Sequence, residues 1–134
     1  MMGLTRKGEY AIRGMIYLAR KASGETTQVS EIARAVDVPA AFLSKIFQDF
    51  GHLGLIRSYR GSGGGVVLSR APEDITLREV VEAIEGPIMP NCCLAPDHQC
   101  QQDTSCQVHP VWRRVQTQVV GILESVTLRE LAET

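Results

Sequence analysis

The chain has 134 residues, with 14 Lys and Arg against 15 Asp and Glu, and its formal net charge at pH 7 is −1. This length provides one domain with a modest core. We expect neither a signal peptide before Thr5 nor a membrane-spanning segment, because the apolar runs are too short to cross a bilayer. A cytoplasmic protein with reduced cysteines is therefore expected.

The net charge hides an uneven distribution along the chain. Residues 1–70 contain ten Lys and Arg against five Asp and Glu, whereas residues 71–134 contain four against ten. A basic first half followed by an acidic second half is typical of a DNA-facing module joined to a module that does not touch DNA.

A first helix is predicted to begin after Thr5, whose hydroxyl suits the N-cap position, and to end near Gly24. Its apolar residues recur at helical spacing. They are Tyr10, Ile12, Met15, Ile16, Leu18 and Ala19.

Two further helices are predicted around a turn at Asp37 and Val38. Ser30 is the expected N-cap of the first, and Pro39 suits the first position of the second, which runs to about Leu53. The second helix is predicted to bury Phe42, Leu43, Ile46, Phe47 and Phe50 and to expose Ala40, Ala41, Ser44, Lys45 and Gln48. The pattern indicates a helix-turn-helix whose second helix enters the major groove, although an ordinary helical hairpin has the same pattern.

A two-stranded wing is predicted next. Leu55 and Ile56 begin a strand, the chain turns through Gly61–Gly65, and Val66, Val67 and Leu68 form the return strand. Arg57, Arg60 and Arg70 are cations close to glycines whose backbone can approach DNA, which suits phosphate or minor-groove contact. A nucleotide-binding glycine loop is disfavoured, because no Lys-Ser/Thr pair and no helix follow.

Two helices are predicted in the second half of the chain. Thr76 and Glu79 form a capping box for a helix that ends at Gly86-Pro87, and Thr127 and Glu130 repeat this box near the C-terminus. Between them lies a long apolar stripe, which is Val108, Val111, Trp112, Val115, Val119, Ile122, Leu123 and Val126. A stripe of this width favours packing against a second copy of the helix, giving a homodimer, over completion of the monomer core.

All four cysteines and two of the three histidines lie between Cys92 and His109. Thiolates and an imidazole on one short segment suit iron or zinc. The spacing is loose for a zinc finger and lacks the tight repeats of bacterial ferredoxins. A disulfide or four idle thiols is the other interpretation of this segment, and it requires an oxidising compartment for the disulfide.

Taken together, these segments resemble the IscR/NsrR/RirA family of iron-sulfur winged-helix regulators. The resemblance rests on LTRKGEYAIRGMIYLA, LIRSYRGSGGGVVLSR, ITLREVVEAIEG, the cysteines, HPVWRRVQ and VTLREL, and it covers nearly the whole chain. It implies a dimeric transcription factor, in most cases a repressor, with an iron-sulfur cluster of the 2Fe-2S or 4Fe-4S type that alters operator binding.

The resemblance also implies the cluster ligands. Cys100 and Cys106 match two of the three family cysteines, and Cys93 is preferred over its neighbour Cys92 for the third. His109 matches the histidine ligand of the IscR type, while Glu9 stands where other members place an acidic ligand donated by the partner subunit. His98 and His52 match no ligand position and are expected on the surface.

The expected fold class is mainly α, with a winged helix-turn-helix, a two-stranded wing, a cysteine-rich loop and a long C-terminal dimerisation helix. The expected boundaries are 1–86 for the DNA-binding module, 87–107 for the cysteine-rich loop and 108–134 for the dimerisation helix and a short final turn. The expected DNA-binding residues are Ser30, Ala40, Ala41, Ser44, Lys45, Gln48, Arg57, Arg60, Gly61, Ser62, Gly63 and Gly64.

The expected partners are double-stranded DNA, as a pseudo-palindromic operator, and a second copy of the chain, with no membrane and no small-molecule substrate. A zinc-structured or thiol-switched winged-helix regulator is the alternative function. A thiol-disulfide enzyme is disfavoured, because the sequence has no Cys-x-x-Cys motif, and no catalytic residues are expected.

Overall fold

The computed structural model describes residues 3–94 and 106–134, with the exception of the Cys92 side chain. Cys100 and His98 therefore lie outside the described residues. The described chain is mainly helical with one two-stranded antiparallel sheet, which confirms the predicted fold class. Its elements are α1 (Arg6–Ala19), α2 (Val29–Val36), α3 (Ala40–His52), β1 (Ile56–Tyr59), β2 (Gly65–Leu68), η1 (Pro72–Asp74), α4 (Leu77–Glu85), η2 (Cys92–Leu94), α5 (His109–Ser125) and α6 (Leu128–Ala132).

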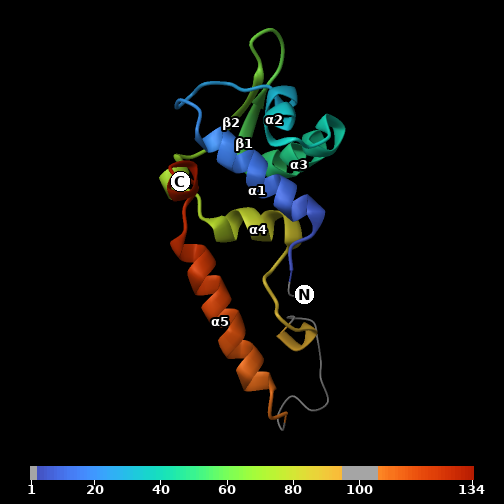
Figure 1. Cartoon of the computed structure of the whole chain (residues 1–134), viewed down its shortest axis with the longest axis vertical. Coiled ribbons are helices and arrows are strands. Elements are labelled where there is room, and N and C mark those ends of the chain that lie inside the picture. Colours follow the sequence, from blue (N-terminus) through green and yellow to red (C-terminus); the bar gives the residue numbers. More distant parts are fainter. Residues whose placement is uncertain (1–2, 95–105) are drawn as a thin grey trace.

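Helix α1 begins as predicted, because the Thr5 hydroxyl accepts a hydrogen bond from the Gly8 N–H at 3.2 Å. It ends at Ala19, earlier than the predicted position near Gly24, and Arg20 is its C-cap. Helices α2, α3 and α4 pack around α1, with α4 lying across it on the side away from the wing (Figure 1). Helix α1 is therefore the centre of the domain.

Helices α2 and α3 form the predicted helix-turn-helix, but two cap predictions are wrong. Helix α2 is capped by Gln28 rather than Ser30, and Pro39 is the N-cap of α3 rather than its first residue. The turn between the helices places Asp37 in the left-handed region at φ 58°, a conformation that Asp tolerates better than most residues.

The wing forms as predicted, with Ile56 paired to Leu68 and Tyr59 to Gly65. A further isolated bridge joins Thr27, just before α2, to Val66. At Gly65 a Cβ atom would lie 2.5 Å from the Thr27 carbonyl oxygen, so the close approach of these segments requires glycine there. The wing is thus attached to the start of the helix-turn-helix.

The core lies between α1, α3, the base of the wing and α4. Its largest fully buried side chains are Phe47, Phe50, Met15, Ile32, Leu43, Ile46, Ile75, Leu128 and Val80. Leu128 belongs to α6, so the C-terminal turn is part of this core. Burying side chains of this size contributes about 1.5–3 kcal/mol each.

The capping box predicted at α4 is confirmed, with Thr76 and Glu79 each bonding the backbone of the other. At α6 the Thr127 hydroxyl accepts from the Glu130 N–H at 3.2 Å. The two Thr residues also face each other in an antiparallel bridge, supported by hydrogen bonds from the Leu77 N–H to the Val126 carbonyl at 2.8 Å and from the Leu128 N–H to the Ile75 carbonyl at 2.9 Å. This paired segment, which we call the Thr76–Thr127 clamp, holds the end of α5 against the body, while the rest of α5 extends away (Figure 1).

Candidate nucleic-acid interface and cysteine site

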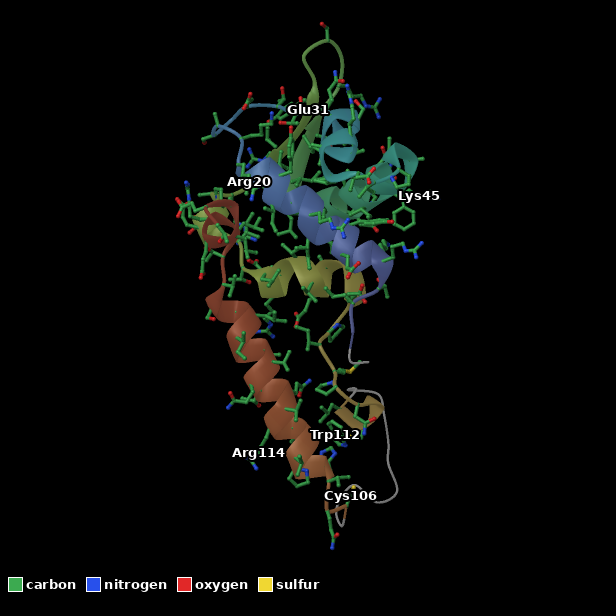
Figure 2. The ribbon with its side chains drawn as sticks, viewed as in Figure 1. Arg20, Glu31, Lys45, Cys106, Trp112 and Arg114 are labelled. Atoms are coloured by element: carbon green, nitrogen blue, oxygen red, sulfur yellow. The ribbon has the colours of Figure 1, made fainter. Side chains whose placement is uncertain are left out.

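The outer surface of α3 carries the predicted reading residues. Ala40, Ala41, Lys45 and Gln48 are exposed and Ser44 is half-buried. Figure 2 shows Lys45 on the outside of the domain, at the end occupied by α2, α3 and the wing. The exposed surface therefore combines small side chains with a cation and an amide, which are groups that can contact bases or phosphates.

Phe42 differs from its prediction. It was expected in the core, but 41% of its surface is exposed. Its ring packs edge to face against Tyr10 of α1, with centroids 5.5 Å apart and planes at 89°. The reason is its angular position, since Phe42 lies roughly 75° from the centre of the face formed by Leu43, Ile46 and Phe50.

Helix α1 also positions α2 and α3 through polar contacts. Lys7 pairs with Asp49 of α3 at 3.0 Å. The Tyr17 hydroxyl donates to Glu31 of α2 at 2.6 Å, and Lys21 pairs with the same carboxylate at 2.7 Å. The hydrogen bond from Lys21 and then that from Tyr17 hold the pKa of Glu31 below its ordinary value, against the opposing effect of burial.

The wing presents an exposed basic tip. Arg57, Arg60, Gly61, Ser62 and Gly63 are exposed, and Gly64 is half-buried. The Thr26 hydroxyl donates to the Gly63 carbonyl at 2.8 Å, which ties the tip to the loop after α1. At Gly64 a Cβ atom would lie 2.4 Å from the Tyr59 carbonyl oxygen, so this tight turn requires glycine.

Arg70 has a different position from the other two wing arginines. Its guanidinium donates to the Asp74 carbonyl at 2.9 Å and to the Glu79 carboxylate at 2.7 Å. Arg70 therefore supports the capping box of α4, and we do not count it among the cations available to DNA.

All four cysteines lie in the segment between the end of α4 and the start of α5, which we predicted to be the cysteine-rich loop. Cys93 and Cys106 are partly exposed, and Figure 2 places Cys106 at the end of α5 farthest from the wing. Trp112 lies on the side of α5 that faces η2, which contains Cys92 and Cys93. The two cysteine-bearing ends of the loop therefore meet the same part of α5.

His109 is the first residue of α5. Its Nε2 atom accepts a hydrogen bond from Nε of Arg113 at 3.2 Å, and its Nδ1 atom is buried. Glu9 is exposed on α1. Over residues 3–94 and 106–134, no three His, Cys, Asp or Glu side chains gather in a group that could hold a metal. Thiols and an imidazole are donors of the types that bind iron, but the ligand set stays a prediction, because Cys100 and the Cys92 side chain lie outside the described residues.

Helix α5 exposes much of its apolar stripe. Among its residues and the preceding Val108, the exposed fractions are 55% for Val108, 49% for Val111, 36% for Val119 and 63% for Ile122. Beside this helix an apolar groove of about 450 Å³ opens against α4 and the start of α1. Its lining includes Leu4, Val81, Ile88, Val115 and Leu123. None of the described helices combines the length and the apolar composition needed to cross a membrane.

A helix-turn-helix followed by a two-stranded wing, with a basic exposed surface, defines a winged-helix DNA-binding protein. The sequence model of the Rrf2 family, described as an iron-dependent transcriptional regulator, matches residues 4–134. The chain belongs to the Rrf2 family, which is a family of transcriptional regulators and not of enzymes.

Several relatives agree with this assignment. An rrf2-like HTH-type transcriptional regulator of Rhodobacter capsulatus is 32% identical over 96% of this chain and 91% of its own length. The HTH-type transcriptional regulator IscR of Photorhabdus laumondii is 29% identical over 97% of this chain and 79% of its own length.

Solved structures have the same architecture. CymR (YrzC), the global cysteine regulator of B. subtilis, is 30% identical, with a TM-score of 0.81 over 99% of this chain and 98% of CymR. Staphylococcus aureus CymR in its oxidized form is 27% identical, with a TM-score of 0.74 over 99% and 98%. IscR of T. potens, at 23% identity, shares the fold with a TM-score of 0.76 over 98% and 87%.

Sequence reasoning missed two features near these sites. One is the exposure of Phe42. Its angular position on α3 is a signal of exposure, but its apolar side chain favoured a core assignment. The other is the contact of Glu85 with Thr5, which joins residues 80 positions apart and leaves no local signal.

Proposed function

We propose that this protein binds a pseudo-palindromic operator as a homodimer in the cytoplasm, that it represses transcription, and that an iron-sulfur cluster on Cys93, Cys100, Cys106 and His109 controls this binding. The observation that carries the proposal is that all four cysteines lie in the segment that joins α4 to α5. Helix α4 packs on α1 of the DNA-binding module, and α5 carries the exposed apolar stripe. A change in this loop acts on both parts.

The DNA-binding part of the proposal rests on one end of the molecule. Helix α3 would lie in the major groove with Ala40, Ala41, Ser44, Lys45 and Gln48, and Ser30 of α2 would contact the backbone nearby. The wing would place Ser62 toward the minor groove, where the glycines allow close approach, while Arg57 and Arg60 would contact phosphates. These three elements lie together at the end of the domain opposite the start of α5 (Figure 1).

The dimer part rests on α5. A side chain such as Ile122, with 63% of its surface exposed, gains about 1–2 kcal/mol when this remaining surface is buried. The stripe formed with Val111 and Val119 is matched by the apolar groove beside it, and a two-fold interface would bury both surfaces twice. Two recognition helices at a fixed distance would then match two operator half-sites.

The cluster part rests on the chemistry of the donors. Two cysteines at opposite ends of the loop and an imidazole at the start of α5 would close the loop around one group, with Cys92 and the partner subunit's Glu9 as alternates for a thiolate and for the imidazole. A cluster would supply a redox-sensitive group at this position. An imidazole or carboxylate in place of one thiolate lowers the net negative charge and gives a more exchangeable ligand, which suits a sensor.

The proposed mechanism is a change in geometry. Cys93, Cys100, Cys106 and His109 would hold the cluster and so fix the loop between α4 and α5, and with it the distance between the two recognition helices. After loss or oxidation of the cluster these residues would no longer constrain the loop, and a change of a few ångströms in half-site spacing would lower operator affinity, because both helices must reach their grooves together.

A second candidate is a thiol-switched regulator of the same fold that holds no cluster. The likeness to CymR in its oxidized form favours it, together with the partial exposure of Cys93 and Cys106. In this case a cysteine pair would oxidise and a reductant would restore it, so two thiols become one disulfide with release of two electrons and two protons to the oxidant.

Metal content separates the two candidates. The protein is purified without oxygen, and iron, acid-labile sulfide and zinc are measured per subunit together with the visible absorption spectrum. We expect equal iron and sulfide, and their amount per subunit distinguishes a two-iron from a four-iron cluster. Zinc alone, or no metal, would contradict the cluster and favour the structural-zinc or thiol-switched regulator.

Ligand variants test the coupling. Cys100→Ala and Cys106→Ala are expected to lose iron and sulfide and to change operator affinity while the protein remains a dimer. His98→Ala is the matched control for His109→Ala, because His98 lies in the same segment and matches no ligand position. If both cysteine variants bind the operator as wild type does, the cluster does not control DNA binding.

A further inference from the structure

We propose that Phe42 is a specificity-determining residue that contacts the 5-methyl group of a thymine in each operator half-site. The inference rests on the proposed role of α3 as the recognition helix and adds a base preference to it. It comes from a residue whose sequence pattern placed it in the core and whose structure places it at the surface.

The exposure of Phe42 is specific to its position. Helix α3 contains three phenylalanines, and Phe47 and Phe50 are buried, with 2% and 0% of their surface exposed, against 41% for Phe42. Its neighbours Ala40 and Ala41 are also exposed. A large aromatic side chain that stays partly in water on the surface of α3 is suited to an apolar partner.

The Phe42 ring is also held in place. Tyr10 packs against it edge to face at 5.5 Å, and the guanidinium of Arg13 lies 5.9 Å from the centre of the Tyr10 ring. Lys7 and Asp49 fix the same part of α1 to α3 at 3.0 Å. A supported ring with only two rotatable side-chain bonds loses little conformational entropy on binding.

The chemistry of the ring limits what it can recognise. A phenyl group neither donates nor accepts a conventional hydrogen bond, so it cannot read the polar edges of bases, and its negative face does not attract phosphate. The one apolar group that bases display in the major groove is the 5-methyl of thymine. The start of a recognition helix is the part that contacts base edges, and Phe42 is the third residue of α3. Lys45 and Gln48, one turn or more further along, supply the polar contacts.

The experiment removes the methyl group from the DNA and the ring from the protein. Full-length protein, purified without oxygen and also after cluster removal, selects its preferred duplex from a random-sequence pool. Each thymine of that duplex is then replaced by deoxyuracil, which deletes only the 5-methyl group, and affinity is measured for the wild type and for Phe42→Ala. Phe42→Leu keeps an apolar side chain, and Leu53→Ala removes an exposed apolar side chain from the other end of α3.

We expect deoxyuracil at one position in each half-site to weaken wild-type binding about fourfold per half-site, from about 0.8 kcal/mol for one buried methyl-sized group. Phe42→Ala is expected to bind the thymine and deoxyuracil duplexes equally. Phe42→Leu is expected to keep part of the discrimination, and Leu53→Ala all of it.

Two results would overturn this inference and leave the proposed DNA binding intact. One is tight wild-type binding that no deoxyuracil substitution weakens, which needs no variant and so does not depend on folding. The other is a Phe42→Ala protein, folded by circular dichroism, that keeps the wild-type ratio. A wild type that enriches no sequence would overturn the proposed DNA binding itself and this inference with it.

Discussion

Glu85, the last residue of α4, accepts hydrogen bonds from both the backbone N–H and the hydroxyl of Thr5, the N-cap residue of α1. The same Thr5 hydroxyl accepts from the Gly8 N–H at 3.2 Å. A carboxylate thus lies at the positive end of the α1 dipole, one residue before the chain enters the connection to the cysteine-rich loop. The start of α1 and the start of this connection are therefore joined at one carboxylate oxygen of Glu85, Oε1.

The Thr5 and Glu85 contact predicts a measurable coupling. Thr5→Ala removes the N-cap and is expected to lower the free energy of unfolding by about 1 kcal/mol. Glu85→Gln keeps the shape of the side chain and removes its charge. Urea unfolding of both single variants and of the double variant is expected to show a coupling energy of about 0.5 kcal/mol or more. Additive effects would show that the contact does not stabilise the protein.

Replacing Gly8 with alanine is expected to have an unusual effect on the stability of the protein. In the interior of a helix, Gly→Ala stabilises by roughly 1 kcal/mol. At Gly8 the new Cβ would lie 2.5 Å from Oε1 of Glu85, so the carboxylate must move away from Thr5. Gly51 of α3 is the matched control, since nothing lies within 4 Å of its Cβ position. We expect thermal unfolding to show a gain for Gly51→Ala and none for Gly8→Ala, and equal gains would contradict the proposed crowding.

The lowered pKa of Glu31 predicts that the free energy of unfolding depends on pH. Lys21 and then Tyr17 lower its pKa in the folded protein. Its contribution to stability is therefore present above the pKa of the unfolded chain, about 4.3, and is lost as the pH falls through the lower folded value. Urea unfolding between about pH 3 and pH 6 is expected to show a weaker pH dependence for Glu31→Gln than for the wild type. Ser23→Ala, on the exposed loop after α1, changes no titratable group and is the control, expected to keep the wild-type pH dependence.

The exposed position of Ile122 in the apolar stripe predicts that a charge there weakens the dimer. Ile122→Lys places a charge in the apolar stripe of α5 twice in a two-fold interface, so we expect the dimer dissociation constant to rise by on the order of 100-fold or more. Sedimentation velocity over a range of concentrations measures this change. Thr117→Lys, also exposed on α5 but outside the stripe, is expected to leave the dimer intact. An intact Ile122→Lys dimer would place the interface elsewhere.

Removing the Arg60 side chain is expected to change how DNA affinity depends on salt concentration. If its guanidinium contacts a phosphate in each half-site, Arg60→Ala weakens binding to specific and unrelated DNA alike and reduces the slope of log affinity against log salt by about one per half-site. Arg114 is the control, because it is exposed on α5 at the opposite end of the molecule (Figure 2). A loss confined to the preferred sequence would assign Arg60 to base reading rather than to phosphate contact.

Local signals predicted the parts of the fold that depend on a few neighbouring residues. The caps at Thr5 and Thr76 and the turns of the wing are confirmed, because each depends on side chains within about four positions of the backbone group that they bond. The predicted family resemblance is confirmed for a similar reason, because the wing and the cysteines follow each other in a recognisable order along the sequence.

The errors arise where distant residues decide the local structure. Ser30 is not the cap of α2, because the Thr27 N–H and carbonyl are bound to Val66 at 3.1 and 2.8 Å, and this pairing fixes where the chain enters the helix. Phe42 lies at the edge of the buried face of α3, and how much of its ring is covered depends on Tyr10 of the distant helix α1. The cluster ligands and the DNA-contacting residues stay predictions, since they depend on groups that a single chain does not contain.

The Thr76–Thr127 clamp fixes the C-terminal end of α5, so a tilt of this helix would pivot about that end. The helix has 17 residues and is about 25 Å long, so its His109 end stands that far from the clamp. A rotation of about 6° at the pivot moves the far end by about 2.5 Å, while the residues next to the clamp hardly move. Small adjustments around Cys106 would thus become a change of tilt along the exposed apolar stripe of α5.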